Sequence, residues 1–193
     1  MPNMDAKSVQ VFFERVATDW DTMRLAYYDE RVIEKMAEVS KVDEDSEVAD
    51  VGTGTGFVAA GLAPRVKRVV GIDSAPAMLE VAGKNLRALG VSNVDLVVGD
   101  AARLPLEDGS VDAAFANMVL HHALDPAAML REMARVVRPG GAVAITDEVE
   151  HPYVWMRDEH ADVWLGFEPE QVARLFSSAG LSEGYGYESL GMQ

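Results

Sequence analysis

The chain has 193 residues, of which 49% are hydrophobic and 25% are charged. These fractions are close to the averages for folded domains, so a disordered, fibrous or low-complexity chain is excluded, and the length fits one domain. The 32 acidic side chains outnumber the 17 basic ones and give a formal net charge of −15. Since a surface this acidic repels phosphate groups, we expect neither nucleic acid nor an anionic membrane surface among its partners.

Cellular location is addressed by three further features of the sequence. The chain has no cysteine, so it has no disulfide framework that would point to secretion. The segment Met1–Lys7 lacks the basic start and apolar stretch of a signal peptide, and no apolar run approaches the ~18 residues needed for a membrane span. We therefore expect a cytoplasmic protein without a membrane span.

Two helices are predicted in the N-terminal segment, residues 1–45. Apolar residues recur at helical spacing over Val9–Thr18 and Glu30–Val39, on either side of an aromatic segment, Trp20–Tyr28. The charged run Lys41–Glu47 indicates a solvated loop. We interpret this first segment as a helical cap in front of the core of the same domain, residues 46–150.

After this loop, short β-type runs alternate with helical stretches. The predicted strands are Val48–Val51, Arg68–Ile72, Val94–Val98, Val111–Ala116 and Gly141–Thr146, and the predicted helices are Val58–Ala63, Ala75–Leu89 and Ala127–Val137. Such alternation indicates βαβ units, and hence an α/β fold with a doubly wound, mostly parallel sheet. Ligands bind such sheets at the carboxyl ends of the strands, so we expect functional residues directly after each strand.

The tail, residues 151–193, begins with an aromatic, acid-rich stretch, Tyr153–Gly166. A helix is predicted over Pro169–Ala179, followed by a single strand within Leu181–Leu190. We expect this tail to lie on the substrate side of the domain.

A glycine-rich turn follows the first predicted strand, with Gly52, Gly54 and Gly56 at alternate positions after Asp50. Glycine permits a tight turn and a close approach of a ligand to the backbone, and the N–H groups of the following helix then face that ligand. The alternative is a plain strand-to-helix turn. The dinucleotide pattern G-x-G-x-x-G fits only loosely, and the observed spacing suits a nucleoside without a pyrophosphate.

Two further acids follow the second and third strands. Asp73 is placed to accept hydrogen bonds from ribose hydroxyls, or else to cap the next helix, a role that suits Ser74 better. Asp100, flanked by Gly99 and Ala101, can accept a bond from an exocyclic amine such as that of adenine, or it is an ordinary loop residue.

Taken together, these motifs resemble the class I S-adenosylmethionine-dependent methyltransferases. The resemblance is greatest to the small-molecule type, close to the ubiquinone/menaquinone C-methyltransferases. It extends over Glu47–Asp147 and rests on five motifs at the family's spacing: the glycine turn, Gly71-Ile72-Asp73, Gly99-Asp100-Ala101 with Leu104–Asp112, Leu120-His121-His122, and Arg135–Gly141.

The resemblance implies a Rossmann-like methyltransferase fold that binds S-adenosylmethionine. The cofactor-binding residues that it implies are Asp50, Gly52, Thr53, Gly54, Gly56, Asp73, Ser74, Met78, Gly99, Asp100, Ala101, Ala102 and Asn117. Members of the family usually complete the sheet with a two-stranded antiparallel hairpin, and here only Tyr185–Leu190 is a candidate. The hairpin is therefore expected to be incomplete, either because the chain is truncated or because a partner chain, as in a homodimer, covers the edge.

The substrate side is predicted from aromatic and histidine residues. His122, and less strongly His121, are candidate catalytic bases because they follow the fourth strand, where acceptor and methyl group should meet. Trp20, Tyr27, Tyr28, Trp155 and His160 are the predicted substrate-binding residues, although an aromatic core patch explains the aromatic members equally well. His160 and its acidic neighbours could join in a metal site, but a solvated helix face is the simpler reading, and no metal is expected.

The predicted function is in-line transfer of a methyl group from S-adenosylmethionine to a small-molecule acceptor. One alternative is an NAD(P)-dependent oxidoreductase, for which the sequence has no Tyr-x-x-x-Lys pair or similar hydride-site signature. The other is a non-catalytic module that binds the cofactor for regulation.

Overall fold

A computed structural model describes residues 5–181 and 184–191. Residues 1–4 of the segment inspected for a signal peptide, and two residues of the predicted tail strand, lie outside this part. Five strands form one sheet in the order β3-β2-β1-β4-β5, and every neighbouring pair is parallel. The strands are β1 (Glu47–Val51), β2 (Arg68–Asp73), β3 (Val94–Val98), β4 (Val111–Asn117) and β5 (Val137–Thr146). The predicted parallel α/β sheet is confirmed.

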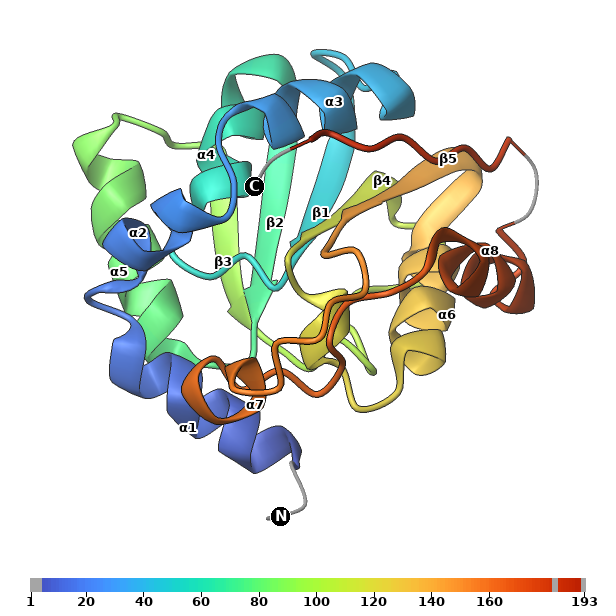
Figure 1. The fold of residues 1–193 in the computed structure, drawn as a ribbon. Coiled ribbons are helices and arrows are strands. Elements are labelled where there is room, and N and C mark those ends of the chain that lie inside the picture. The colour runs from blue at the N-terminus through green and yellow to red at the C-terminus, as the bar shows by residue number, and fades with distance from the viewer. Residues whose placement is uncertain (1–4, 182–183, 192–193) are drawn as a thin grey trace.

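Helices cover both faces of this sheet (Figure 1). Side chains alternate along each strand, so in β4 Phe115 contributes to one hydrophobic core and Ala114 and Ala116 to the other. The first core is closed by α3 (Arg31–Ser40) and α4 (Phe57–Leu62), and the second by α6 (Pro126–Val136) and α8 (Pro169–Ser178). The remaining long helix, α5 (Pro76–Ala88), packs on β2 and β3.

The N-terminal helix α1 (Ala6–Val16) lies across the end of the sheet beside the short helix α7 (Met156–Glu159), as Figure 1 shows. Asp5 starts α1 by accepting a 2.8 Å hydrogen bond from the backbone N–H of Ser8. A small apolar cluster that includes Phe13, Ala75 and Met78 joins α1 to α5. The predicted aromatic segment contains α2 (Trp20–Met23) and the 3₁₀ turn η1 (Arg24–Ala26). The chain thus brings its N-terminal helix to the carboxyl ends of the strands.

The last strand begins earlier than predicted. It starts at Val137 instead of Gly141, directly after α6, and includes the Pro139-Gly140-Gly141 run. The pairing of β4 with β5 shifts register between Val111 and Ala113. Since β5 is an edge strand, it tolerates a proline and this irregularity, which a central strand would not.

The predicted tail strand is wrong. Residues 184–191 form no strand, and nothing in the described part of the chain pairs with the outer edge of β5. Side-chain contacts hold the tail instead: the ring of Tyr185 packs on Phe176, and Glu188 forms a 2.7 Å ion pair with Lys35 of α3. The tail therefore crosses from α8 toward α3 (Figure 1) and does not extend the sheet. Over the described residues, no helix has the length and hydropathy that a bilayer crossing requires.

Candidate functional site

A cavity of about 700 Å³ lies at the carboxyl ends of β1 to β4. All the predicted cofactor-binding residues line it except Gly56; those that do are Asp50, Gly52, Thr53, Gly54, Asp73, Ser74, Met78, Gly99, Asp100, Ala101, Ala102 and Asn117. The order β3-β2-β1-β4 reverses the winding direction between β1 and β4, and that reversal is where ligands of such sheets bind. The volume lies within the range of pockets that hold drug-sized ligands.

The glycine turn is built for close packing. Gly52 has a φ of +69°, and a Cβ at this position would collide with the side chain of Val119. The N–H groups of Gly52 and Thr53 donate to the carbonyl of Ile72 at 2.8 and 3.0 Å, which fixes the turn against β2. Gly56 has a φ of +86° and precedes α4, where a Cβ would lie 3.2 Å from that of Ala82. Gly56 thus allows α4 to approach α5 and does not face the cavity, in contrast to its predicted role.

Asp50 is buried under this turn. Its carboxylate accepts hydrogen bonds from the Thr53 hydroxyl at 2.7 Å and from the backbone N–H of Ala59 at 3.1 Å. Burial raises the pKa of Asp50 to about 7, although both hydrogen bonds oppose the shift. These contacts orient the glycine turn.

Asp73 connects two neighbouring strand ends. Its carboxylate accepts hydrogen bonds of 2.9 Å from the backbone N–H groups of Gly54 and Ala75. Burial raises its pKa, and these bonds oppose that rise. No side chain caps α5, so the expected capping by Ser74 is wrong; the carbonyl of Ser74 instead accepts a 2.9 Å bond from Gln10.

Three further residues of the predicted set, two polar and one apolar, line the cavity at other strand ends and on α5. Asp100 is exposed after β3 and accepts a 2.9 Å bond from the N–H of Ala102. Asn117, at the end of β4, is buried, and its side-chain oxygen accepts a 2.6 Å bond from Thr146. Met78 of α5 is buried and also lines the cavity. Each lies after a strand or on the helix that follows one, as the topology predicts.

The N-terminal segment was predicted as a helical cap, but no residue of α1 was among the predicted site residues. Lys7, Val9, Gln10 and Phe13 all line the large cavity. The helical spacing of Val9 and Phe13 was a usable signal, but spacing alone does not say which surface a helix covers. This helix forms part of the cavity wall.

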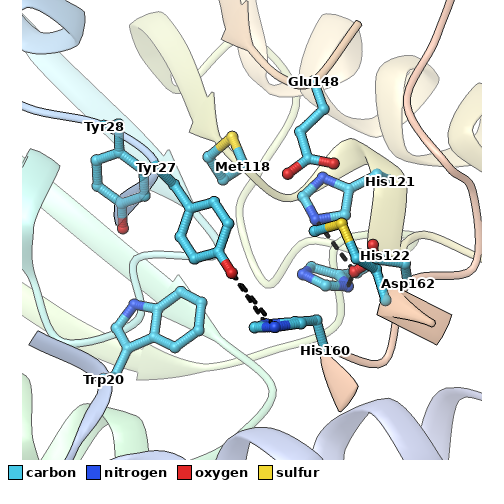
Figure 2. A pocket seen from close by; sticks show the side chains of 10 residues that line it. Trp20, Tyr27, Tyr28, Met118, His121, His122, Glu148, His160 and Asp162 are labelled. Carbon is cyan, nitrogen blue, oxygen red and sulfur yellow. Dashed lines mark hydrogen bonds and ion pairs between the residues drawn. The ribbon is translucent and has the colours of Figure 1, made fainter. Parts of the chain in front are cut away.

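A second, smaller cavity of about 20 Å³ adjoins the first (Figure 2). Its lining residues are Trp20, Tyr27, Tyr28, Met118, His121, His122, Glu148, Met156, His160 and Asp162. Four of these, Trp20, Tyr28, Met118 and His122, also line the large cavity. The predicted substrate-binding residues are therefore gathered here, with one exception. Trp155 lines neither cavity; it is 47% exposed and packs its ring on His160.

The two adjacent histidines differ in charge. His121 is buried, and its Nδ1 lies 2.8 Å from Asp147 Oδ1. Burial alone would lower the pKa of His121, but the negative charge and hydrogen bond of Asp147 outweigh it and raise this pKa to about 9. For His122, burial and then the positive charge of His121 lower the pKa well below 6.5. At neutral pH, His121 is protonated and His122 is neutral with a free lone pair.

Tyr27 faces these histidines from the opposite side of the small cavity. Its hydroxyl lies 3.3 Å from Nε2 of His160, and Figure 2 shows the two side chains pointing toward each other. Tyr28 is almost fully buried, and burial raises its pKa to about 12, so it stays neutral. Sequence reasoning missed Glu148 and Asp162 in this group. Glu148 follows β5 closely, as does Asp147, so the rule that polar residues after strands form the site would have found Glu148. The rule would not have found Asp162, which follows no strand.

Comparisons with known proteins agree with this geometry. Residues 49–145 match a family model described as a methyltransferase domain. Malonyl-[acyl-carrier protein] O-methyltransferase of Marinomonas sp. is 32% identical over 136 residues, which are 69% of this chain and 49% of that protein. A 2-methyl-6-phytyl-1,4-hydroquinone methyltransferase of rice is 31% identical over 140 residues, 71% of this chain and 41% of that protein. The chain thus spans half or less of the length of these relatives.

Solved structures show the same fold. A SAM-dependent methyltransferase from Aquifex aeolicus aligns with a TM-score of 0.70 and 27% identity, covering 86% of this chain and 87% of that one. The YcgJ protein of Bacillus subtilis aligns with a TM-score of 0.70 and 26% identity, covering 78% and 68%. The [4+2]-cyclase SpnF shares the fold with a TM-score of 0.78 at 24% identity, covering 91% and 72%. The presence of a cyclase among these structures means that the fold alone does not fix the reaction.

Proposed function

The chain belongs to the S-adenosylmethionine-dependent methyltransferase family, and from this premise we propose that it transfers the methyl group of S-adenosylmethionine to a small-molecule acceptor. The observation that carries the proposal is the large cavity. In it the glycine turn, Asp73 and Asp100 approach one another from the ends of three neighbouring strands. These groups suit an adenosyl ligand that has no pyrophosphate.

Each part of the cofactor has a proposed partner in this cavity. Asp73 would accept hydrogen bonds from the ribose hydroxyls, and Asp100 with Ala101 and Ala102 would contact the adenine. The methionine part would lie over Gly52 and Gly54, near Asn117. The support for this placement is that all of these residues line one continuous space.

The reaction requires the protein mainly to position its reactants. The bond between methyl carbon and sulfur breaks as a bond forms from the acceptor to that carbon, and S-adenosylhomocysteine leaves. Because the sulfonium is already activated, alignment of the two reactants supplies much of the rate, with effective molarities worth roughly 7–11 kcal/mol. An acceptor that arrives protonated must also lose a proton.

The proposed acceptor side is the region where the small cavity meets the large one, because the small cavity alone holds little more than one water molecule. Trp20, Tyr27 and Tyr28 give it aromatic walls, and His122 reaches both cavities in its neutral form. A flat or apolar acceptor fits such walls better than a charged one. His122 can accept a proton from the acceptor.

We also propose a cytoplasmic location, no nucleic-acid partner and a homodimer. The net charge of −15 supports the lack of a nucleic-acid partner, since it disfavours binding to phosphate groups, and a chain without cysteine fits a cytoplasmic location. The homodimer is supported by the outer edge of β5, which no strand covers in the described part of the chain. Sedimentation of the purified protein would test the dimer.

Calorimetry tests the cofactor. We expect binding of S-adenosylmethionine and S-adenosylhomocysteine and none of NAD(H); the opposite result would favour the oxidoreductase alternative. Transfer of a labelled methyl group to a panel of phenols, quinols and small carboxylates then tests catalysis. Cofactor binding without turnover on any acceptor would favour the non-catalytic module.

A further inference from the structure

Two groups of potential metal ligands meet beside the small cavity. Donor atoms of His121, His122 and Asp162 lie within 4.8 Å of one another, and so do donor atoms of Glu148, His151 and Asp162. Asp162 belongs to both groups. Of these residues, only Asp162 is among the acidic neighbours of His160 that the sequence analysis weighed as a metal site, and no metal was expected there.

Asp162 is the unusual member of this cluster. Its side chain is 1% exposed, and neither carboxylate oxygen has a hydrogen-bond partner within the part of the chain that the structure describes. Its nearest basic neighbours are Nε2 of His121 at 3.8 Å and Nδ1 of His122 at 3.9 Å, both beyond hydrogen-bond distance. Since buried carboxylate oxygens without partners are costly, such a group indicates that a bound cation completes the site.

The second-sphere contact of His121 is that of a metal ligand. Asp147 contacts Nδ1 of His121 at 2.8 Å, and Nε2 of the same ring is the nitrogen that faces Asp162. Metal-binding histidines usually donate one ring N–H to a carboxylate or a carbonyl, which fixes the ring and leaves the other nitrogen for the ion. Asp147 is itself held, because it accepts bonds from the backbone N–H groups of Leu120 and Glu148.

We propose that His121, His122 and Asp162 bind one divalent transition-metal ion, of which Zn²⁺ and Mn²⁺ are the best candidates. Two imidazoles and a carboxylate suit such ions and leave coordination positions open. Glu148 adds a negative charge next to the site, because its carboxylate points toward the His121 ring (Figure 2). A 2.9 Å hydrogen bond from His151 holds this carboxylate in place.

The ion would face the small cavity, which these three ligands line. Its role in catalysis rests on the proposed function: bound to an acceptor hydroxyl, it would lower the pKa of that group so that the proton passes to solvent water. His122 would then serve as a ligand, and no free imidazole base would be needed.

Metal binding can be tested without any acceptor. The untagged full chain, freed of metal with a chelator, is titrated with Zn²⁺ by calorimetry and with Co²⁺ by visible absorption. We expect one ion per chain and a Co²⁺ spectrum typical of mixed nitrogen and oxygen ligands. Asp162→Asn and His121→Ala should weaken Zn²⁺ binding at least ~100-fold, and Asp147→Asn should weaken it ~10–100-fold through loss of ring positioning.

His160→Gln is the matched control, because it removes a histidine from the same cavity that belongs to neither ligand group. It should leave Zn²⁺ affinity unchanged. Wild-type protein that binds no ion, or Asp162→Asn that binds as tightly as wild type, overturns the inference. Circular dichroism verifies folding, and if His121→Ala does not fold, the nearly isosteric Asp162→Asn still decides. Binding of S-adenosylhomocysteine by the same samples tests the proposed function separately.

Discussion

The carboxylate of Asp73 accepts a 2.9 Å hydrogen bond from the backbone N–H of Gly54, nineteen residues earlier in the chain. This bond joins the end of β2 to the turn that follows β1. The same carboxylate lines the large cavity and is the proposed ribose partner. One side chain thus fixes the glycine turn and faces the ligand.

Asp73→Ala should therefore weaken binding of S-adenosylhomocysteine. Loss of a charged hydrogen bond costs about 1.5–3 kcal/mol, or roughly 10- to 150-fold in affinity. Calorimetry measures the change. Asp73→Asn separates the two roles, because its amide oxygen can still accept from Gly54 while the charge is lost. Asp95→Ala, an exposed acid in β3 that pairs with Arg68, is the control. Unchanged affinity of Asp73→Ala would remove this residue from the site.

The raised pKa of Asp50 predicts that the stability of the protein depends on pH. Burial raises its pKa from 3.8 to about 7 in the folded protein, so the folded state holds a proton that the unfolded state releases. Between about pH 4 and pH 7 the free energy of unfolding should fall as pH rises, by at most about 4 kcal/mol from this group. Asp50→Asn should flatten that part of the urea-denaturation profile. An unaltered pH profile in this variant would contradict the prediction.

Ligand binding should protect α1. Gln10 and Phe13 of this helix line the large cavity, and Gln10 also donates to the carbonyl of Ser74. A cofactor in the cavity adds contacts to the helix and should slow its local opening. Hydrogen exchange of residues 6–16 should therefore slow when S-adenosylhomocysteine is added, whereas exchange in α8, on one face of the sheet, should change little. Equal protection of both helices would indicate a global effect instead.

Substitution of Arg135, which lies on α6 beside the second core, should destabilise the protein. Its guanidinium forms 2.7 Å ion pairs with Glu132 and Asp108 and donates to the carbonyls of Leu104 and Leu106. Arg135→Ala should lower the free energy of unfolding by about 1–3 kcal/mol, because the two carbonyls lose their donor and Glu132 keeps only its bond from the backbone N–H of Leu104.

Arg131→Ala is the matched control for that substitution. Arg131 lies on the same helix, but its only ion pair is the exposed one with Asp125 at 3.7 Å among the contacts of residues 5–181 and 184–191. Exposed pairs of this kind contribute ~0–1 kcal/mol. Urea denaturation of both variants compares them, and equal losses would show that the network around Arg135 adds little.

The sheet and the large cavity could be predicted because their signals are local. Strand–helix alternation gives the order of elements, and each polar residue after a strand is placed by the parallel topology. Asp50, Asp73 and Asp100 were found in this way. The start of β5 was misjudged because Pro139 and Gly140 are typical of turns, and only an edge position allows them in a strand.

The acceptor side could be predicted only in part, because it depends on contacts between distant segments. Tyr27 meets His160 across 133 positions, and His121 meets Asp162, which comes after α6, β5 and α7 in the chain. The spacing of apolar residues along the sequence does not reveal which distant segments come into contact. The tail was misjudged for a similar reason, since a distant partner, Lys35, and the ring of Phe176 determine its course.

The two cavities share a wall that consists of Trp20, Tyr28, Met118 and His122. A ligand in the larger cavity therefore fixes the position of one wall of the smaller cavity. Steady-state kinetics should therefore show a compulsory order, with the methyl donor entering first and its demethylated product leaving last. In that scheme the product competes with the donor but not with the acceptor, which inhibition patterns would reveal.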